Sequence, residues 1–388
     1  MDYSEIFVRF GEIALKSPSV RHRMEKRLAR NIRKFLKKID LPNSLVSIKR
    51  SWGRLVITLE AEELQKTGLT STNVAQLLAE NVCGIVSTSP VYRAPLTELE
   101  KVALSLAEEK LQQNSSFAVR VRRFGTHNFT SKDVEAKIGG IIHEKFKDRG
   151  ISVNLTRPDY LLQIEIKNEL AFVFDTTFRG YGGFPQGGQG TIAAILRGSL
   201  EDAIAAFLLC KRGAIIIPLT FEVENFAGKF SNVEELQKQL TFFARIQPTK
   251  GHYFKVNFDN LLEKIEIENI TCSICDKVCL GIANRIIEGQ HKKGIVLGNA
   301  EDAILHRNPE TAKPPQPPIY YPLIALDKET VRHPFNERKF QSGFCLNDCP
   351  GYQKQKRKKG KQLSDAKIAK IVASAEFELV IPAQESPR

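Results

Sequence analysis

A strand, a helix and a second strand follow one another in the second half of the chain, and this pattern constrains the fold more than any other feature of the sequence. The apolar run 191–196 predicts a buried strand, 203–212 predicts a helix, and 214–219 predicts the next strand after Gly213. Successive strands joined by a helix lie parallel in one sheet, with helices on its faces. We therefore predict a parallel-sheet α/β domain over residues 191–385.

The first part of the chain has a different pattern, in which short strands accompany an amphipathic helix. Residues 3–10 predict a strand, and the serine–proline pair at Ser17 predicts the start of a helix that runs to about Lys38, because serine caps helix N-termini and proline fits their first turn. Residues 44–60 predict two further strands. These elements indicate a small α+β domain over 1–70.

A second α+β domain is predicted over residues 71–178. Its strands are predicted from alternating apolar positions at 117–123, 152–156, 161–167 and 170–176. The segment 179–190 follows, and half of its residues are glycine, which is typical of a linker. The fold class predicted for the whole chain is therefore α/β multidomain, with two α+β domains before the parallel-sheet domain.

The positive charge of the chain is concentrated at two places. The formal net charge is +13, and residues 1–38 contribute +7 while 354–361 contribute +6, so the remainder is neutral on balance. Such clusters favour a polyanionic partner, either nucleic acid or an anionic membrane surface, with a solvated surface as the alternative. On the predicted helix the basic positions recur every three or four residues, so they share one face that can follow a phosphate backbone: Arg23, Arg27, Arg30, Lys34 and Lys37.

Several protein classes are disfavoured by the sequence. No apolar stretch approaches the roughly 20 residues needed to cross a membrane, and the N-terminus has neither a basic start nor an apolar run typical of a secretory signal. The seven cysteines are an odd number, and five lie in two close groups, which favours metal binding over a disulfide framework. We therefore expect a cytoplasmic protein with no membrane partner.

Four motifs carry a resemblance to a known family. They are Gly11-Glu12-Ile13-x-x-Lys16, Arg120-Val-Arg-Arg123-x-Gly125-x-His127-x-Phe129-x-Ser131-x-Asp133, Arg157-Pro158-Asp159 and Gly180-x-Gly182-Gly183-x-Pro185-x-Gly187. With them the chain resembles the tRNA thiouridine synthetases, also called tRNA sulfurtransferases, over about residues 4–350. The resemblance implies a ferredoxin-like domain at 1–70, a THUMP RNA-binding domain at 71–178 and an ATP-using pyrophosphatase-loop domain at 191–385.

What the resemblance implies about activity is specific. Members of the family bind the acceptor region of tRNA, adenylate the oxygen of a nearby uridine and replace that oxygen with sulfur. The resemblance therefore implies tRNA and a sulfur donor as partners, and a homodimer. The side chains suited to phosphate and sugar contacts on a folded RNA are Lys16, Arg23, Arg27, Arg30, Arg120, Arg122, Arg123 and His127.

The loop expected to bind ATP departs from the family pattern. Members carry Ser-Gly-Gly-x-Asp-Ser between the first strand and helix of the third domain, because small residues let backbone N–H groups approach the phosphates. The matching stretch here is Arg197-Gly198-Ser199-Leu200-Glu201-Asp202, which keeps one glycine. Arg197 offers a cation to a phosphate, whereas Ser199 with Asp202 predicts a helix that caps itself and holds no nucleotide. Use of ATP and Mg²⁺, and with it enzyme activity, stays open at this stage.

The grouped cysteines predict a metal site in the third domain. Cys272 and Cys275 form one pair, with Cys279 a helical turn later, and Cys345 and Cys349 form a second group. Thiolates at these spacings ligate an iron–sulfur cluster or zinc. The resemblance favours a cluster on Cys272, Cys275 and Cys349 with one iron open to carry sulfide, and it makes Cys345 and Cys349 the candidate catalytic residues. If Cys345 is also a ligand, the site is closed and structural.

Three functions are therefore compatible with the sequence. The leading interpretation is a tRNA-binding protein of the sulfurtransferase type with a cysteine-bound cluster or metal. The altered loop favours a non-catalytic tRNA-binding or sulfur-delivery partner of a complete enzyme. A zinc-stabilised RNA-binding module without sulfur chemistry is the third, and it requires four cysteine ligands. In each of the three functions, the basic segment 354–361, which follows Cys345 and Cys349 in the sequence, offers a further contact to RNA phosphates.

Overall fold

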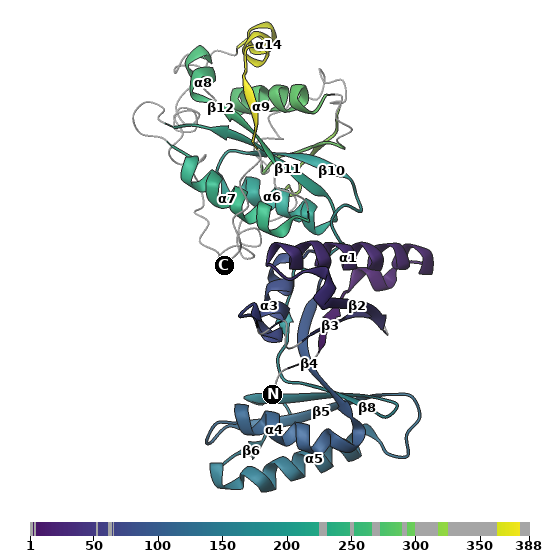
Figure 1. Ribbon diagram of the computed structural model, residues 1–388. Coiled ribbons are helices and arrows are strands. Elements are labelled where there is room, and N and C mark those ends of the chain that lie inside the picture. The colour runs from purple at the N-terminus through teal and green to yellow at the C-terminus, as the bar shows by residue number, and fades with distance from the viewer. Residues whose placement is uncertain are drawn as a thin grey trace. The chain divides into compact units, whose positions relative to one another are not determined.

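The computed structural model describes most of the chain and divides it into two compact units, Met1–Gly183 and Phe184–Arg388 (Figure 1). The residues it describes are 3, 5–51, 53–60, 64, 66–224, 231–248, 252–265, 272–288, 293–298, 317–324 and 363–380. Within these residues no helix is long and apolar enough to cross a membrane.

The described part of the first unit is built on one continuous sheet of nine strands. Their order is β2-β3-β1-β4-β8-β7-β5-β6, with β9 beside β4. The strands are β1 (Glu5–Arg9), β2 (Val46–Ser51), β3 (Arg54–Leu59), β4 (Ser87–Pro95), β5 (Ser116–Phe124), β6 (Ser152–Val153), β7 (Tyr160–Lys167), β8 (Leu170–Phe174) and β9 (Phe178–Arg179). The long strand β4 joins the two halves, because its first residues pair with β1 and its last residues pair with β8.

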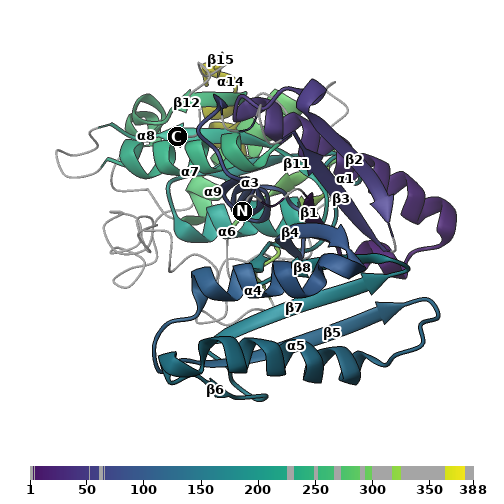
Figure 2. The same cartoon turned by 60° about the horizontal axis from the view of Figure 1, so that its bottom comes forward.

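Helices cover one face of each half of this sheet. Those of the first half are α1 (Pro18–Lys38) and α3 (Ser71–Asn81), and those of the second are α4 (Leu99–Lys110) and α5 (Ser131–Phe146). Figures 1 and 2 show α4 and α5 together on the same side of β5, β7 and β8. The apolar core lies under these helices, where Leu162, Ile164 and Ile166 of β7 are buried. The intervening residues of the strands point to the other side, which we call the helix-free face.

The predicted helix at the N-terminus is confirmed, with two local differences. Pro18 occupies the first turn of α1, but the Ser17 side chain makes no capping hydrogen bond. The spacing of four between Val20, Met24 and Leu28 predicts that all three point inward, but Val20 and Met24 are only half buried. The fully packed side of α1 is formed by Leu28, Ile32, Phe35 and Leu36.

The second unit contains the predicted parallel sheet. Its strand order is β14-β13-β10-β11-β12-β15, and every pair is parallel except β12 with β15. The strands are β10 (Thr191–Leu196), β11 (Ile215–Glu222), β12 (Tyr253–Asn257), β13 (Ile295–Val296), β14 (Ile319–Tyr320) and β15 (Phe377–Val380). The strand β10 lies in the centre of the sheet and is covered on both faces, so its residues form a continuous apolar run.

Helices cover both faces of this second sheet. They are α6 (Leu200–Lys211), α7 (Val233–Ile246), α8 (Asp259–Ile265), α9 (Cys272–Ile287) and α14 (Asp365–Ala373). Figure 1 shows α6 and α7 on one face and α9 on the other. The helix α6 begins three residues before the predicted start, because the Ser199 hydroxyl caps it by accepting from the Asp202 N–H at 3.2 Å.

The glycine-rich segment 179–190 is hydrogen-bonded along its length. The Gly180 N–H donates to the Val86 carbonyl at 2.8 Å in the first unit, and the Phe184 N–H donates to the Lys211 carbonyl at 2.9 Å in the second. A Cβ at Gly180 would lie 2.4 Å from the Ile85 carbonyl oxygen, so this position admits only glycine. The domain boundaries and linker inferred from the sequence stay predictions.

Candidate functional site

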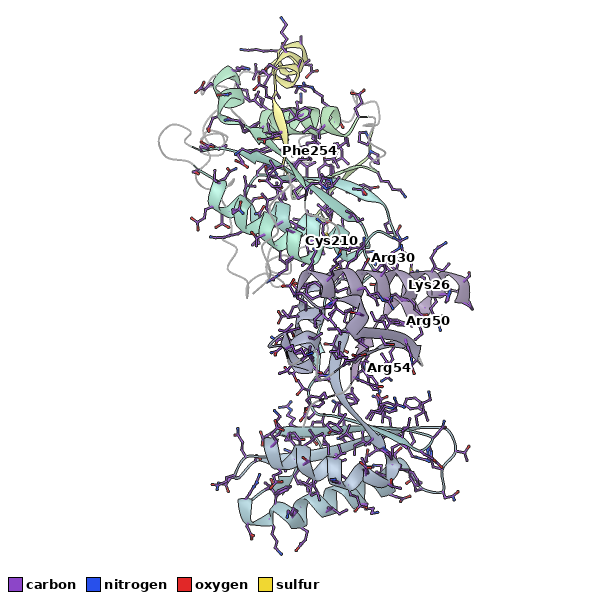
Figure 3. All side chains as sticks on the ribbon, viewed as in Figure 1. Lys26, Arg30, Arg50, Arg54, Cys210 and Phe254 are labelled. Carbon is purple, nitrogen blue, oxygen red and sulfur yellow. The ribbon has the colours of Figure 1, made fainter. Side chains whose placement is uncertain are left out.

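A row of basic side chains lies on the exposed side of α1. We define the α1 basic face as Arg23, Lys26, Arg30, Lys34 and Lys37, all of which are exposed. Figure 3 shows Lys26 and Arg30 on this helix and Arg50 on the neighbouring strand β2. The predicted Arg27 is half buried and lies at the edge of the row. Sequence reasoning missed Lys26, although its spacing of three from Arg23 already indicates the same side of the helix.

Lys16 lies just before α1, at the end of the short 3-10 helix η1 (Glu12–Leu15). Ile13 is fully buried, and the Ala14 N–H donates to the Gly11 carbonyl at 2.9 Å. The Arg21 guanidinium donates to the Ala14 carbonyl and so ties this turn to α1. The family-like motif therefore holds an exposed lysine next to the start of the helix that bears the α1 basic face.

The helix-free face carries a second group of arginines. Arg120 and Arg122 of β5 are exposed, while Val119 and Val121 between and beside them are buried, as the alternation predicts. In the sheet Arg122 pairs with Glu165 of β7, and Glu165 pairs in turn with Phe172 of β8. The exposed arginines of β5 thus share one face of the sheet with aromatic side chains of β8.

Two arginines that the sequence analysis did not select, Arg9 and Arg54, lie on the same helix-free face. The Arg54 guanidinium donates to Glu165 at 2.8 Å and lies 4.6 Å from the centre of the Phe7 ring. The Arg9 guanidinium lies 5.1 Å from the Phe174 ring. Burial lowers the pKa of Arg9 to about 10, and the charge of Arg54 adds to the shift, so Arg9 remains a cation at neutral pH. The sequence analysis missed these two arginines because their position on this face depends on the pairing of strands from both halves of the sheet, which the sequence does not display.

The end of β5 and the loop after it carry the remaining predicted RNA-binding residues, Arg123 and His127. The Arg123 guanidinium lies 5.5 Å from the centre of the Phe129 ring, and the His127 ring lies 5.1 Å from the same centre. His127 Nε2 is 2.9 Å from the Asn168 carbonyl oxygen. Asp133 accepts from the Thr130 N–H at 2.7 Å in the capping box of α5, and these hydrogen bonds lower the pKa of its carboxyl. The motif therefore combines the cation of Arg123 at the surface with Asp133, which caps the N-terminus of α5.

The loop between β10 and α6 is closed by an internal ion pair. Both oxygens of the Asp202 carboxylate are used: one accepts from the Arg197 N–H and Nε at 3.1 and 3.0 Å, and the other from Arg197 Nη2 and the Gly298 N–H at 2.9 and 3.0 Å. The Asp202 side chain is fully buried, and that of Arg197 is 13% exposed. The self-capped helix predicted for Ser199 and Asp202 is confirmed.

The second arm of Arg197 reaches the helix that carries the first cysteine pair. Its Nη1 donates to the Asp276 carboxylate at 2.7 Å, and Asp276 directly follows Cys275 in the first turns of α9. Cys275 is half buried, whereas Cys279 is fully buried in the apolar core. Cys345, Cys349, the side chain of Cys272 and the segment 354–361 lie outside the described residues. Among the residues that are described, no three His, Cys, Asp or Glu side chains form a metal-binding group.

Polar side chains of α7 and its N-terminus fix the backbone of the same loop. The Asn232 amide donates to the carbonyls of Arg197 and Phe221 at 2.9 and 2.8 Å, and the Gln239 amide donates to the Ser199 carbonyl at 2.9 Å. Both side chains are buried. The roles of Asn232 and Gln239 could not be predicted from the sequence, because their contacts with Arg197 and Ser199 join residues 35 and 40 positions apart.

Comparison with protein families finds three matches in sequence order. Residues 5–89 match the ThiI ferredoxin-like domain, residues 93–174 match the THUMP domain, and residues 187–334 match the thiamine biosynthesis protein ThiI. The first two matches meet within β4, the strand that joins the two halves of the nine-stranded sheet.

Individual relatives cover most of the chain. It is 31% identical over 343 residues to a probable tRNA sulfurtransferase of Methanosarcina mazei, covering 84% of this chain and 80% of that protein. It is 30% identical over 341 residues to a probable tRNA sulfurtransferase of Methanocaldococcus jannaschii, covering 84% and 86%.

Two solved structures share the fold. The crystal structure of PH1313 from Pyrococcus horikoshii superposes with a TM-score of 0.63 at 26% identity, covering 86% of this chain and 99% of that one. A 4-thiouridine synthetase in complex with RNA and bound ATP gives a TM-score of 0.67 at 19% identity, covering 98% and 100%.

Proposed function

Because the chain belongs to the tRNA sulfurtransferase family, we propose that it binds tRNA through its first unit and acts in the formation of a thiolated uridine. The observation that carries this proposal is the α1 basic face, whose five cations are exposed on one side of a single helix. Evenly spaced cations on a rigid helix match the spacing of phosphates along an RNA backbone. The helix-free face adds Arg120 and Arg122 from a THUMP domain.

The two basic surfaces have different tasks in this proposal. Contacts from lysine and arginine to phosphates fix the position of the RNA and carry no base information, which suits the α1 basic face. The helix-free face carries the exposed Arg120 and Arg122 on the same side of the sheet as the half-buried Phe172, and arginine and aromatic side chains suit the sugars and unpaired bases at RNA ends. Glu165 holds Arg54 at 2.8 Å, so this arginine is oriented before RNA arrives.

The cysteines supply the proposed sulfur site. Cys275 is half buried at the N-terminal end of α9, and thiolates there suit an iron–sulfur cluster, with zinc as the alternative. We assign Cys272, Cys275 and Cys349 as ligands, with Cys345 as a fourth ligand or a second reactive thiol. When bound, a cluster with one open iron supplies sulfide. The chain's own contribution is to hold the first turns of α9 in place through the Arg197–Asp276 ion pair.

The described loop does not fit ATP. The backbone N–H groups of Arg197 and Gly298 and the Arg197 guanidinium already donate to Asp202, so we derive no adenylation step for this chain. This observation favours a second candidate function, in which the chain presents tRNA or sulfur to a complete enzyme that activates the uridine.

The tRNA-binding part is tested by the dependence of affinity on salt. Replacing Arg23→Gln with Arg30→Gln removes two exposed charges from the α1 basic face, and Lys101→Gln with Lys137→Gln removes two from α4 and α5 as the matched control. We expect the first pair to reduce the slope of log affinity against log salt by roughly 1.4–1.8, since each phosphate contact contributes about 0.7–0.9. Equal slopes for the two double variants would contradict tRNA binding by the α1 basic face.

A further inference from the structure

The second unit contains a buried network of charges at residues 197–202, where the resemblance to the family predicts the loop that binds ATP. The start of a helix after a parallel strand is a natural anion site, because backbone N–H groups and the helix dipole both face the ligand. In this chain an anion already lies there. It is the carboxylate of Asp202, which is fully buried and accepts four hydrogen bonds.

Among the described residues, the backbone packs too closely around this carboxylate to admit a phosphate beside it. A Cβ at Gly298 would lie 2.2 Å from the Asp202 nitrogen and 2.3 Å from the Glu201 carbonyl carbon, so the chain after β13 lies directly against the first turn of α6. A phosphate at this point would have to displace both the Asp202 side chain and the Gly298 backbone. It would also meet the charges of Asp202 and Asp276, and like charges repel strongly where water is excluded.

The same network connects three separate elements. Arg197 directly follows β10, Asp202 belongs to α6, and Asp276 belongs to α9 beside Cys275. The Arg197 guanidinium contacts both carboxylates, at 2.9 and 2.7 Å, and the Gly298 N–H adds the segment that follows β13. A ligand phosphate bridges such elements only while it is bound, whereas these side chains bridge them permanently.

We infer that Asp202 is a built-in substitute for a nucleotide phosphate. The loop is closed to ATP, and Arg197 locks the cysteine-bearing end of α9 against α6 without any nucleotide. The inference deepens the second candidate of the proposed function and rests on the proposed function for its link to thiolation, whereas the closure of the loop itself is independent of tRNA binding. It places the activation of the uridine, which needs a nucleotide, in a different protein, and it leaves the N-terminal turns of α9, which carry Cys275, held in place without ATP.

Two measurements on the full chain test this inference. The first is equilibrium dialysis of labelled MgATP and of inorganic pyrophosphate against the wild type and Arg197→Gln. We expect no stoichiometric binding of either probe to the wild type. Stoichiometric binding to the wild type that Arg197→Gln abolishes would overturn the inference, whereas binding unchanged by Arg197→Gln lies at another site and leaves the loop closed.

The second measurement is hydrogen exchange of the peptides that contain the N-terminal turns of α6 and α9. MgATP should leave their exchange unchanged in the wild type, and Arg197→Gln should accelerate it at least several-fold in both peptides together. The matched control is Lys277→Gln, which removes an exposed ion pair with Asp365 from the same helix and should leave the α6 peptide unchanged. ATP-dependent protection in the wild type, or acceleration confined to α6, would overturn the inference.

Filter binding of tRNA to the same preparations separates this result from the proposed function. Arg197→Gln should bind tRNA as the wild type does, because Arg197 lies in the second unit and the proposed tRNA contacts lie in the first. A wild type that fails to bind tRNA would refute the proposed function and leave the closed loop untouched.

Discussion

Replacing Asp202→Asn should destabilise the second unit far more than an equivalent change at the surface. The substitution keeps the shape of the side chain but removes the charge that faces Arg197, and it turns one acceptor into a donor beside two Arg197 nitrogens. Because the Asp202 side chain has 0% exposure, water cannot compensate for the loss. Removing one member of a buried ion pair costs about 3–5 kcal/mol. Since Arg197 keeps Asp276, we expect a loss near 3 kcal/mol, the lower end of that range.

The matched control is Asp365→Asn, which removes one member of the Lys277–Asp365 pair. Its side chains are 55% and 92% exposed at a separation of 3.3 Å, and such pairs contribute about 0–1 kcal/mol. Urea titration read by hydrogen exchange of second-unit peptides reports the free energy of unfolding of that unit for both variants. A loss below about 1 kcal/mol for Asp202→Asn, equal to the control, would refute the view that this ion pair holds the loop.

Three further outcomes are expected. Arg54→Met should destabilise the first unit by about 3 kcal/mol, because it removes the partner of Glu165, whose side chain is only 9% exposed. Lys147→Met is the control and should cost no more than about 1 kcal/mol, because both side chains of its pair with Glu144 are more than half exposed. Urea titration of the first unit checks both variants, and equal losses would contradict the role of Arg54. Arg122→Gln should weaken tRNA binding more than Lys101→Gln, measured by filter binding at fixed salt, because only Arg122 lies on the helix-free face; equal effects would exclude that face. Cys275→Ala should lose bound iron or zinc by elemental analysis of anaerobically purified protein, while Cys210→Ala, whose thiol is fully buried in α6, should retain it; metal retained by Cys275→Ala would contradict the assigned ligand.

Local sequence patterns predict most of the fold. The strand–helix–strand pattern after residue 190 gives the parallel pair β10 and β11 at nearly their observed bounds, because buried parallel strands need continuous apolar residues. The spacing of basic residues likewise predicts the α1 basic face, since a helix repeats every 3.6 residues. Both properties depend on neighbours in the chain, which a sequence displays directly.

Contacts between strands that are distant in the sequence could not be predicted from it. Arg9 and Arg54 look like isolated surface cations in the sequence, and their place beside Phe7 and Glu165 depends on β4 joining both halves of the sheet. The ion pair from Arg197 to Asp276 spans 79 positions, so the capping pattern at Ser199 predicted a closed helix start but not the partner that locks it. Pairing across such distances is set by tertiary packing, not by local preference.

The claim that this chain acts in uridine thiolation is tested most directly by mass spectrometry of the nucleosides of tRNA from a strain that lacks it. Loss of a thiolated uridine is expected, with recovery on expression of the wild type and no recovery with the double variant Arg23→Gln and Arg30→Gln. A thiolated-uridine content that is unchanged in the strain without the chain would contradict the claim.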